Sequence, residues 1–373
     1  MLKVMTVVGT RPELIRLSLV IGQLDRHTRH TLVHTGQNFD FELNGVFFQD
    51  LGIRTPDLFL NAAGATAIET IAAVLTGVDM ALSTDPPDAL LILGDTNSCL
   101  AAIAAKRRRI PVFHMEAGNR CFDDRVPEEI NRRIVDHTAD IHLPYSQIAR
   151  SYLLREGIAP DQIICTGSPM REILDRHRAR IETSDAVRTL GLEPGEFFLV
   201  SCHRQENVDE APRLRRIFEV LEALWEKYRL PVVFSTHPRT RSRIEASGLA
   251  TPPGTAFLKP FGFTDYIRLQ LDARAVLSDS GTITEESSIL GFPALNLREV
   301  HERPEGMEQA AVMMVGLDRD RILSALRVLE SRQPGQPIAS LVADYAPTNV
   351  SEKVLRIILS YTDFVRRRVW HDA

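Results

Sequence analysis

Three acidic side chains stand at positions where a predicted strand or helix begins or ends. Asp95 follows the apolar run ALLIL (89–93), Glu116 follows VFHM (112–115), and Glu128 begins the helix expected after the next loop. Carboxyl groups that converge from separate elements can hold raised pKa values and can donate and accept protons. Two of them also have simpler interpretations, because Asp95 could cap a helix and Glu128 could favour a helix dipole.

Basic side chains occupy other strand ends. Arg11 lies in GTRPE, immediately beyond the first predicted strand, and Arg16 lies one turn into the following helix. His203 in CHRQEN and His237 in THPRTR follow strands of the second half. The arginine fork suits a diphosphate or a carboxylate. A lone histidine is usually structural, but these groups together predict an anionic ligand at the strand ends.

The segment DSGTITEE, residues 279–286, follows an apolar strand and opens a helix. Backbone N–H groups of Ser280, Gly281 and Thr282 at a helix N-terminus favour an anion. Simple helix capping by Asp279 or Ser280 is the alternative. Glu286, further along the helix, is expected to accept hydrogen bonds from ribose hydroxyls.

Phe263 and Tyr266 in PFGFTDY offer a stacking surface for a flat base, although their helical spacing is also typical of a core. The sequence contains neither GxGxxG nor GxxxxGK[ST], which argues against tightly bound NAD and against an ordinary NTPase. It has no HExxH and no compact triad of metal ligands. We therefore expect neither a cofactor nor a metal.

These side chains need a scaffold of parallel strands. Short apolar runs alternate along the 373 residues with helical segments, and this repeated order predicts doubly wound parallel sheets. The predicted strands are 4–8, 30–34, 89–93, 112–115, 140–144 and 162–166, then 197–201, 231–235, 255–259, 275–279, 293–297 and 312–316. Ligands in such sheets bind beyond the carboxyl ends of the strands, where the polar motifs lie.

Two Rossmann-like α/β domains with a cleft between them account for the two series. We expect an N-terminal domain over residues 1–168, which carries the acid/base residues, and a C-terminal domain over 169–349, which carries the motifs expected to bind an anionic ligand. The amphipathic helix in 350–373 is expected to pack back on the first domain.

Composition excludes several function classes. The net charge is −5, so neither nucleic acid nor an anionic membrane is an expected partner. Four widely spaced cysteines without a CxxC pair suggest neither a zinc cluster nor a disulfide framework. No apolar run approaches 18 residues, and the first residues lead straight into a strand, so the expected location is the cytoplasm.

The order of the motifs resembles a known family. GTRPE, TGQ, GDTNS, EAGNR, PEEINRR, CHRQEN, THPRTR, SDSGTITEE and ERPEG occur in sequence between residues 3 and about 316. Together they look like the non-hydrolysing UDP-N-acetylglucosamine 2-epimerases. The resemblance implies the glycosyltransferase-B-type fold and a homodimer. It also implies elimination of UDP to a 2-acetamidoglycal followed by its re-addition, without nicotinamide.

One branch of that family resembles EAGNRCFDDRVPEEINRRIVDHTADI and HTGQNFDFELN most. That branch converts UDP-2-acetamido-2,6-dideoxy-L-talose to UDP-N-acetyl-L-fucosamine for capsule, O-antigen and lipopolysaccharide. UDP-GlcNAc/UDP-ManNAc 2-epimerisation is the alternative within the family. A glycosyltransferase of the same fold, a hydrolytic epimerase and a sugar-nucleotide-binding regulator are the wider alternatives.

The resemblance also assigns roles to individual residues. The family's acid/base carboxylates match Asp95, Glu116 and Glu128, and its histidine matches His203, which is expected at the diphosphate or the leaving oxygen. Its UDP-sugar contacts match Arg11, Ser280, Gly281 and Glu286, with Tyr266 or Phe263 at uracil, Arg303 and Glu305 in the loop of the site, and Arg132 orienting carboxylates or phosphate.

Two positions depart from the family pattern. The usual lysine of the first helix is Arg16, which keeps a fixed cation but not a titrating amine. The usual TGQH run is TGQN, residues 35–38, followed by Phe39. Some relatives bind a second substrate molecule there as an activator, so this departure argues against such regulation.

Overall fold

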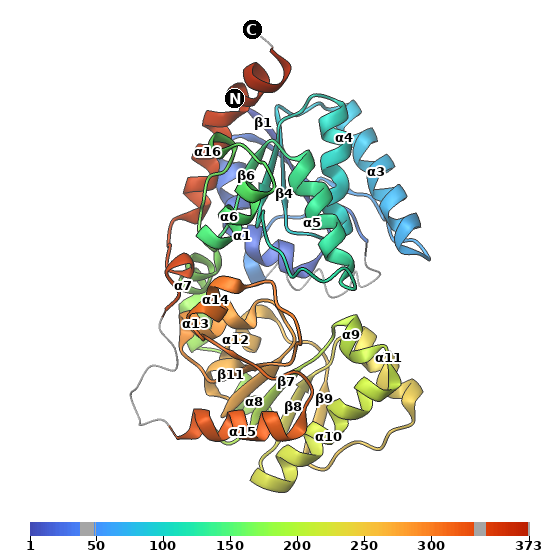
Figure 1. Ribbon diagram of the computed structural model, residues 1–373, viewed down its shortest axis with the longest axis vertical. Helices are drawn as coiled ribbons and strands as arrows, with labels where there is room; N and C mark the ends of the chain where they lie inside the picture. Colours follow the sequence, from blue (N-terminus) through green and yellow to red (C-terminus); the bar gives the residue numbers. More distant parts are fainter. Residues whose placement is uncertain (38–47, 49, 332–340, 372–373) are drawn as a thin grey trace. The chain divides into compact units, whose positions relative to one another are not determined.

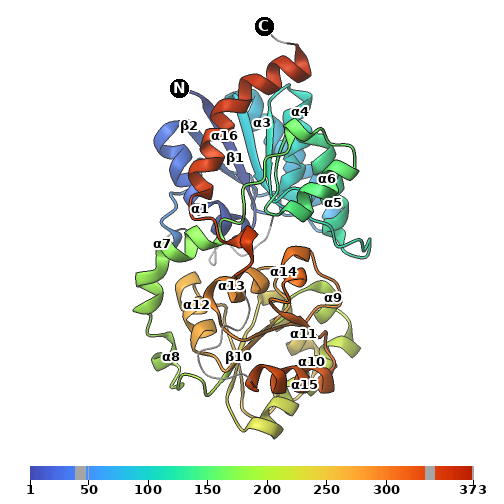
Figure 2. The same ribbon diagram turned by 60° about the vertical axis from the view of Figure 1, so that its left-hand side comes forward.

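The computed structural model describes residues 1–37, 48, 50–331 and 341–371. It divides into two compact units: the N-terminal unit contains Met1–Asp175 and Asp344–Ala373, and the C-terminal unit contains Arg176–Ala343. The boundary falls inside helix α7 (Met170–Glu182), not at residue 168. The last long helix, α16 (Val350–Val365), belongs to the N-terminal unit and packs against α1 (Arg11–His27) (Figure 2).

The N-terminal unit is built on a six-stranded parallel sheet of order β3-β2-β1-β4-β5-β6. Its strands are β1 (Lys3–Val8), β2 (Arg29–His34), β3 (Leu58–Phe59), β4 (Ala89–Leu93), β5 (Val112–Met115) and β6 (Ile141–Leu143). The central strands β4 and β5 are buried along their whole length, as expected of apolar runs covered on both faces.

Helices cover both faces of this sheet (Figure 1). On one face lie α3 (Ala67–Thr84), α4 (Ala101–Arg107) and α5 (Pro127–Thr138), and on the other lie α1, α6 (Gln147–Arg155) and α16. Pro12 in the first turn of α1 and Pro127 at the start of α5 stand where a missing N–H costs no helical hydrogen bond. Proline thus marks the start of both helices, each of which follows a polar segment.

The C-terminal unit repeats this architecture with a parallel sheet of order β12-β11-β10-β7-β8-β9. Its strands are β7 (Phe198–Ser201), β8 (Val232–Ser235), β9 (Thr255–Leu258), β10 (Ala275–Ser278), β11 (Ala294–Asn296) and β12 (Met313–Met314). Its helices are α8 (Ala186–Thr189), α9 (Gln205–Val208), α10 (Ala211–Tyr228), α11 (Pro238–Ser247), α12 (Phe263–Asp272), α13 (Ile283–Leu290), α14 (Pro304–Glu308) and α15 (Arg319–Glu330).

Two apolar clusters flank the second sheet, and residues of each strand alternate between them. Phe198 and Val200 of β7 pack with α10 and α15, whereas Leu199 packs with α8, α12 and α13. This alternation follows from the two-residue period of a strand. The sheet thereby becomes the rigid centre from which the polar loops extend.

One predicted strand is wrong. Residues 162–166 were expected to form a strand of the first sheet, but they form an isolated bridge between Ile163 and His142 and no regular strand. The segment still runs beside β6, because the Ile164 N–H donates to the His142 carbonyl at 2.9 Å and the Thr166 N–H to the Pro144 carbonyl at 3.0 Å. Pro160 opens a short 3-10 turn at its start, and Gly167 turns the chain directly after it.

Helix α3 is the one helix among the described residues that is long and apolar enough to cross a membrane by length and composition. Its Val74 and Val78 belong to the core cluster beneath the first sheet, together with Leu82. The same composition is typical of a helix packed on a sheet, and this is the position of α3 (Figure 1).

Candidate active site

Two of the three predicted carboxylates lie side by side at the carboxyl edge of the first sheet. Strands β4 and β5 are neighbours, and the N–H of Gly94 donates to the carbonyl of Met115 at 3.0 Å. Asp95 follows this turn, in which Gly94 has a φ of 79° that favours glycine. Glu116 directly follows β5.

Glu116 is buried and adopts a left-handed backbone conformation, with a φ of 63°. Such a conformation costs on the order of 1–3 kcal/mol for a residue other than glycine and concentrates at functional sites. The side chain forms an ion pair with Arg16 of α1 and accepts a hydrogen bond from Asn119 Nδ2 at 3.2 Å. The ion pair offsets the cost of burying the carboxylate.

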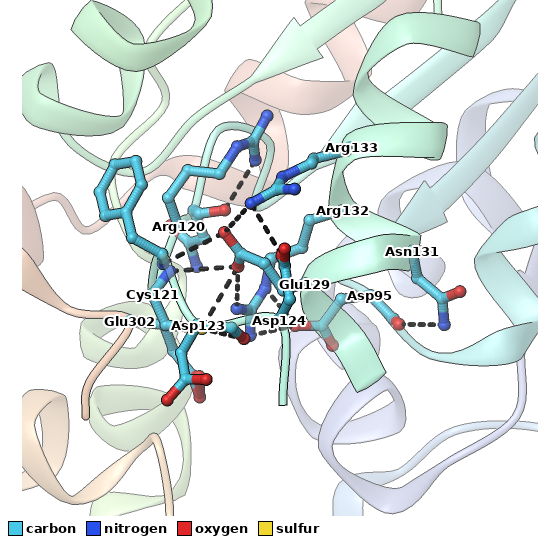
Figure 3. A network of polar contacts seen from close by, with 12 residues as sticks. Asp95, Arg120, Cys121, Asp123, Asp124, Glu129, Asn131, Arg132, Arg133 and Glu302 are labelled. Carbon is cyan, nitrogen blue, oxygen red and sulfur yellow. Dashed lines mark hydrogen bonds and ion pairs between the residues drawn. The ribbon is translucent and has the colours of Figure 1, made fainter. Parts of the chain in front are cut away.

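Asp95 is held by Arg132 of α5, whose Nε and Nη2 donate to Oδ2 at 2.8 and 2.7 Å. Arg132 also donates from Nη1 to Glu129 at 2.9 Å, so one guanidinium joins two carboxylates (Figure 3). The cap of the following 3-10 turn is Thr96, which accepts from the Ser98 N–H. Asp95 therefore points its carboxylate at Arg132 instead of capping that turn.

Glu129 fastens the loop that precedes α5. Its fully buried carboxylate accepts hydrogen bonds from the N–H groups of Cys121 at 3.1 Å and Phe122 at 3.2 Å (Figure 3). Glu128, its neighbour in the first turn of α5, is half-buried. The loop and the start of α5 are thus fixed together next to Asp95.

The other two acids of this loop pair with neighbouring arginines, as expected. Asp123 forms an ion pair with Arg125 at 2.6 Å and Asp124 with Arg133 at 3.1 Å. Both lie nearer to solvent than Glu129. The acids of this stretch therefore divide into buried anchors and exposed pairs.

Glu13 joins the loop after β1 to the loop after β4, although it was absent from the predicted site. Its buried carboxyl accepts from Gly9 N at 3.0 Å, Thr10 Oγ1 at 2.7 Å and Thr96 Oγ1 at 3.0 Å. Burial outweighs these hydrogen bonds and raises the pKa of Glu13 to about 7. Arg11, the first residue of α1, lies exposed beside this junction.

Asp136 of α5 lies buried beneath the Glu116 loop. It accepts hydrogen bonds from His114 Nδ1 at 2.9 Å, Arg120 Nη1 at 2.8 Å and Gly118 N at 3.1 Å. The opposite ring nitrogen of His114 lies 2.8 Å from the carbonyl of Gly94. Burial alone would raise the pKa of Asp136, but His114 and Arg120 hold it below its usual range. One carboxylate thus supports the turns of both Asp95 and Glu116.

In the C-terminal unit, Ser280, Gly281 and Thr282 connect β10 to α13. The N–H of Ser280 donates to Ser278 Oγ at 3.0 Å and that of Thr282 to Ser280 Oγ at 3.3 Å, while the Ser280 and Thr282 hydroxyls lie 3.0 Å apart. A Cβ added at Gly281 would lie 3.3 Å from Glu302 Oε1 and 3.8 Å from Arg204 Nη2. The backbone turn thus passes close to the ion pair of Arg204 and Glu302.

The two predicted histidines are neighbours, with ring centroids 5.6 Å apart. His203 Nδ1 lies 3.1 Å from the buried carboxylate of Asp279. His237 is the cap of α11, and its Nδ1 accepts from the N–H of Arg239 at 3.2 Å. Asp279 was expected as a helix cap, but it faces the turn that carries His203.

Two further predicted residues of this unit are buried in polar pairs. Glu286 Oε2 accepts from Gln270 Nε2 at 2.7 Å. Arg303 donates from Nε to Glu285 at 3.2 Å and stands at the cap position of α14. These pairs fix both side chains near the loop after β10.

The two aromatic candidates differ in exposure. Phe263 is 5% exposed and meets the ring of His177 edge-on at 5.7 Å. Tyr266 is half-buried and packs against the apolar cluster around α12. Stacking of either ring on a base stays a prediction.

The residues missed by the sequence reasoning, Glu13, Asp136 and Asp279, share one property: each is a buried acid that accepts hydrogen bonds from a loop or turn at a strand end. Glu13 stands inside GTRPE and Asp279 inside DSGTITEE, so both lay in motifs that were already singled out. Asp136 gave no signal, because its partners are far away in sequence. Within the described residues, no group of three or more His, Cys, Asp or Glu side chains forms a metal site.

Comparisons with known proteins agree with this geometry. The family model described as UDP-N-acetylglucosamine 2-epimerase matches residues 23–359. The chain belongs to the UDP-N-acetylglucosamine 2-epimerase family. The predicted family and the enzyme class, a non-hydrolysing UDP-sugar 2-epimerase, are thereby confirmed.

Solved structures and curated relatives extend across nearly the whole chain. A structure of UDP-N-acetylglucosamine 2-epimerase from Rickettsia bellii is 49% identical, with a TM-score of 0.93 and full coverage of both chains. The Methanocaldococcus jannaschii UDP-GlcNAc 2-epimerase in complex with UDP-GlcNAc and UDP is 31% identical, with a TM-score of 0.89 and coverage of 96% of this chain and 99% of that one. The UDP-2,3-diacetamido-2,3-dideoxy-D-glucuronate 2-epimerase of Pseudomonas aeruginosa is 34% identical, over 87% of this chain and 92% of its own.

These similarities confirm the predicted fold class, two doubly wound parallel α/β units of glycosyltransferase-B type. The structure describes only part of the segment in which TGQN replaces the usual TGQH, because Asn38 and Phe39 lie outside the described residues. The interpretation of that segment stays a prediction.

Proposed function

We propose that the chain converts UDP-2-acetamido-2,6-dideoxy-L-talose to UDP-N-acetyl-L-fucosamine, a precursor of capsule, O-antigen or lipopolysaccharide. The observation that carries this proposal is the set of carboxylates at the carboxyl edge of the first sheet, each fixed by a cation or by the start of a helix. The loop from Arg120 to Glu129, which carries the resemblance to the L-fucosamine branch, is anchored directly beside them by Glu129.

The reaction at C2 needs two proton-handling groups. A base removes the C2 proton as the C1–O bond breaks, the electron pair of the C2–H bond forms the C1=C2 bond, and UDP leaves with the other pair. UDP then re-adds to the 2-acetamidoglycal while a proton arrives on the opposite face of C2. A C2 hydrogen that is next to no carbonyl is a poor acid, so most of the barrier must be lowered at the departing diphosphate.

We assign proton transfer to Asp95, Glu116 and Glu128. Arg16 and Arg132 keep two of these carboxylates fixed, so that little reorganisation is needed when the proton moves. General acid–base catalysis of this kind contributes about 10²–10⁴-fold in rate.

We assign UDP binding to the C-terminal unit. Ser280, Gly281 and Thr282 form the turn at the N-terminus of α13, where the helix dipole favours an anion, and His203 and His237 lie in the neighbouring strand-end turns. Structures of relatives support a nucleotide site: the Methanocaldococcus jannaschii enzyme was solved with UDP-GlcNAc and UDP.

The substrate is decided by product analysis. Purified protein is incubated separately with UDP-2-acetamido-2,6-dideoxy-L-talose, UDP-GlcNAc and UDP-2,3-diacetamido-2,3-dideoxy-D-glucuronate, and the products are identified by proton NMR. We expect C2 epimers of the 6-deoxy-L-sugar to form fastest, by at least about tenfold in kcat/KM. Faster turnover of UDP-GlcNAc would replace the 6-deoxy sugar with the D-hexosamine alternative that the names of several relatives favour.

We also propose that two copies associate through the outer face of α3 and α5. Ile68 and Met80 of α3 are 74% and 70% exposed, and Ile130 and Ile134 of α5 are also exposed. Helix α4 contacts both α3 and α5 on one face of the sheet (Figure 1). Exposed apolar side chains on one outer face favour association with another protein surface.

A further inference from the structure

Asp279 is the centre of a hydrogen-bond network at the end of β10. Its buried carboxylate accepts from the N–H groups of His203 at 2.9 Å and Arg204 at 2.9 Å. It also accepts from Cys202 Sγ at 3.0 Å and from Asn207 Nδ2 at 3.1 Å. The His203 ring contributes a further contact from Nδ1 at 3.1 Å. One carboxylate therefore organises the whole turn after β7.

These partners require the carboxylate to be ionised. Burial alone would raise the pKa of Asp279, but the His203 ring and the hydrogen bonds hold it well below its usual range. The Cys202 thiol stays protonated, because burial and the negative Asp279 raise its pKa well above the ordinary value. Asp279 is thus a permanent acceptor, and the His203 ring must present a proton to it at Nδ1.

The opposite edge of the ring is left for a ligand. The His203 side chain is 34% exposed, and its Nε2 makes no hydrogen bond to any residue in the described part of the chain. The neighbouring His237 is the reverse case, because its Nδ1 accepts a backbone hydrogen bond. Of the two histidines, His203 alone is held at Nδ1 by a carboxylate.

We propose that Asp279 is a positioning residue of the epimerase, which fixes His203 with a proton on Nδ1 so that Nε2 can donate a hydrogen bond to the departing diphosphate. The inference rests on the proposed function and adds a residue and a step to it. As the C1–O bond breaks, the negative charge grows on the β-phosphate, and the His203–Asp279 pair stabilises it without transferring a proton. The C2 proton goes separately to a carboxylate of the N-terminal unit.

The position of Asp279 in the chain supports this role. It directly precedes Ser280 and Gly281, which are expected to bind the same diphosphate through their backbone N–H groups. Among the residues that the structure describes, the carboxylate of Asp279 itself contacts only the histidine turn, through Cys202, His203, Arg204 and Asn207.

A double-mutant cycle separates positioning from simple structural support. We expect His203→Gln and Asp279→Asn each to lower kcat by about 10²–10³-fold, within the range for a positioned catalytic group. In the His203→Gln background, Asp279→Asn should lower kcat by less than about threefold, because the ring it orients is gone. An equal loss in both backgrounds would overturn the proposal.

Asn207→Ala is the matched control, since it removes another partner of Asp279 and leaves the ring contact intact. We expect it to lower the melting temperature but to leave kcat within about threefold. A loss of kcat as large as that of Asp279→Asn would show that the turn as a whole, and not the ring, is what matters.

A spectroscopic measurement tests the orientation of the ring without a substrate. Long-range ¹H–¹⁵N NMR of histidine-labelled protein should show His203 protonated at Nδ1, and Asp279→Asn should remove that signature. An unprotonated Nδ1 in the wild type would overturn the inference even if Asp279→Asn does not fold. Lack of epimerisation of every UDP-sugar, with Nδ1 protonated, would instead reject the proposed function alone.

Discussion

Glu116 combines a left-handed backbone, burial and an ion pair with Arg16 at the end of a central strand. The left-handed backbone and the burial of a carboxylate each cost free energy, and the ion pair with Arg16 offsets part of that cost. A carboxylate fixed in this way can exchange a proton with substrate without first changing its position. The proposed proton transfer therefore depends on how individual side chains such as Glu116 are held.

Replacing Glu116 by Gln should lower kcat by about 10²–10⁴-fold, because the amide cannot take a proton. UDP affinity, measured by isothermal titration calorimetry, should stay within about threefold, since UDP is assigned to the other unit. Asp79→Asn, which removes an exposed acid of α3 that pairs with Arg108, serves as the control. Turnover that survives Glu116→Gln would remove this residue from the mechanism.

Glu13 gives a prediction about pH. Its pKa in the folded protein is about 7, above the ordinary 4.5, because it is buried. Between these values the folded protein keeps a proton that the unfolded chain has lost, so stability falls as pH rises through this window and levels off above about 7.

Glu13→Gln imitates the protonated carboxyl and does not titrate. Urea unfolding gives the free energy of unfolding of the variant and of the wild type at pH 5 and pH 8. The difference, variant minus wild type, should be about 3 kcal/mol larger at pH 8 than at pH 5. Glu219→Gln, an exposed acid of α10, should show no such gain. Parallel pH profiles for wild type and Glu13→Gln would contradict the raised pKa.

The residues proposed to act on a substrate were easier to predict than those that hold them. Asp95, Glu116 and His203 follow apolar runs, and that position alone placed them at strand ends. Glu129 was not among the predicted site residues, although it contacts Arg132 and Arg133. That it is buried and fastens a loop depends on three-dimensional packing, which residue spacing does not encode.

Elements differ in how clearly their sequence defines them. Strands β4 and β5 were predicted to the residue, because their apolar runs are bounded by polar motifs. Strand β3 has only two residues and was missed, and the run at 162–166 lies hydrogen-bonded beside β6 without forming a regular strand. How regularly such a short run pairs depends on the turns that flank it, which apolar composition does not encode.

At the element scale, Asp136 should control the order of the loop after β5. Asp136→Asn should lower the free energy of unfolding at pH 7 by about 3–5 kcal/mol, because it removes the carboxylate that His114 contacts in the core and leaves the buried Arg120 with Glu156 alone. The folded-state pKa is depressed, so this stability is present above the ordinary carboxyl pKa and is lost as pH falls through and below it. The difference between variant and wild type should therefore shrink in acid.

Hydrogen exchange localises the same effect. The Gly118 N–H, which donates to Asp136, should lose protection in Asp136→Asn and keep it in Asp123→Asn, whose acid pairs only near the surface. Unchanged Gly118 protection in Asp136→Asn would contradict the anchoring role.

The whole molecule consists of two similar units. We assign proton transfer to the N-terminal unit and UDP binding to the C-terminal unit. The alternation of strands and helices predicted both of them, whereas the boundary inside α7 was not predicted, because a continuous helix carries no sequence break at that point. The surface through which two chains associate is likewise not predicted by any motif. We propose it from the apolar side chains that are exposed.

At this scale we predict a dimer. Analytical ultracentrifugation should give a mass near twice the 41.8 kDa of one chain. Ile68→Glu should shift it to the monomer, because a charge would be buried in the contact. Val328→Glu, which replaces an equally apolar exposed residue of α15, should leave the dimer intact. A wild-type monomer, or a dimer unaffected by Ile68→Glu, would reject this surface.

The most direct test of the central claim is isotope exchange at C2. The wild-type protein is incubated in D₂O with UDP-2-acetamido-2,6-dideoxy-L-talose, and proton NMR follows each carbon of the sugar. The account predicts that deuterium enters C2 alone, in both epimers, while UDP stays attached to the sugar at equilibrium. Epimerisation without deuterium at C2, or free sugar that accumulates in step with UDP, would contradict it.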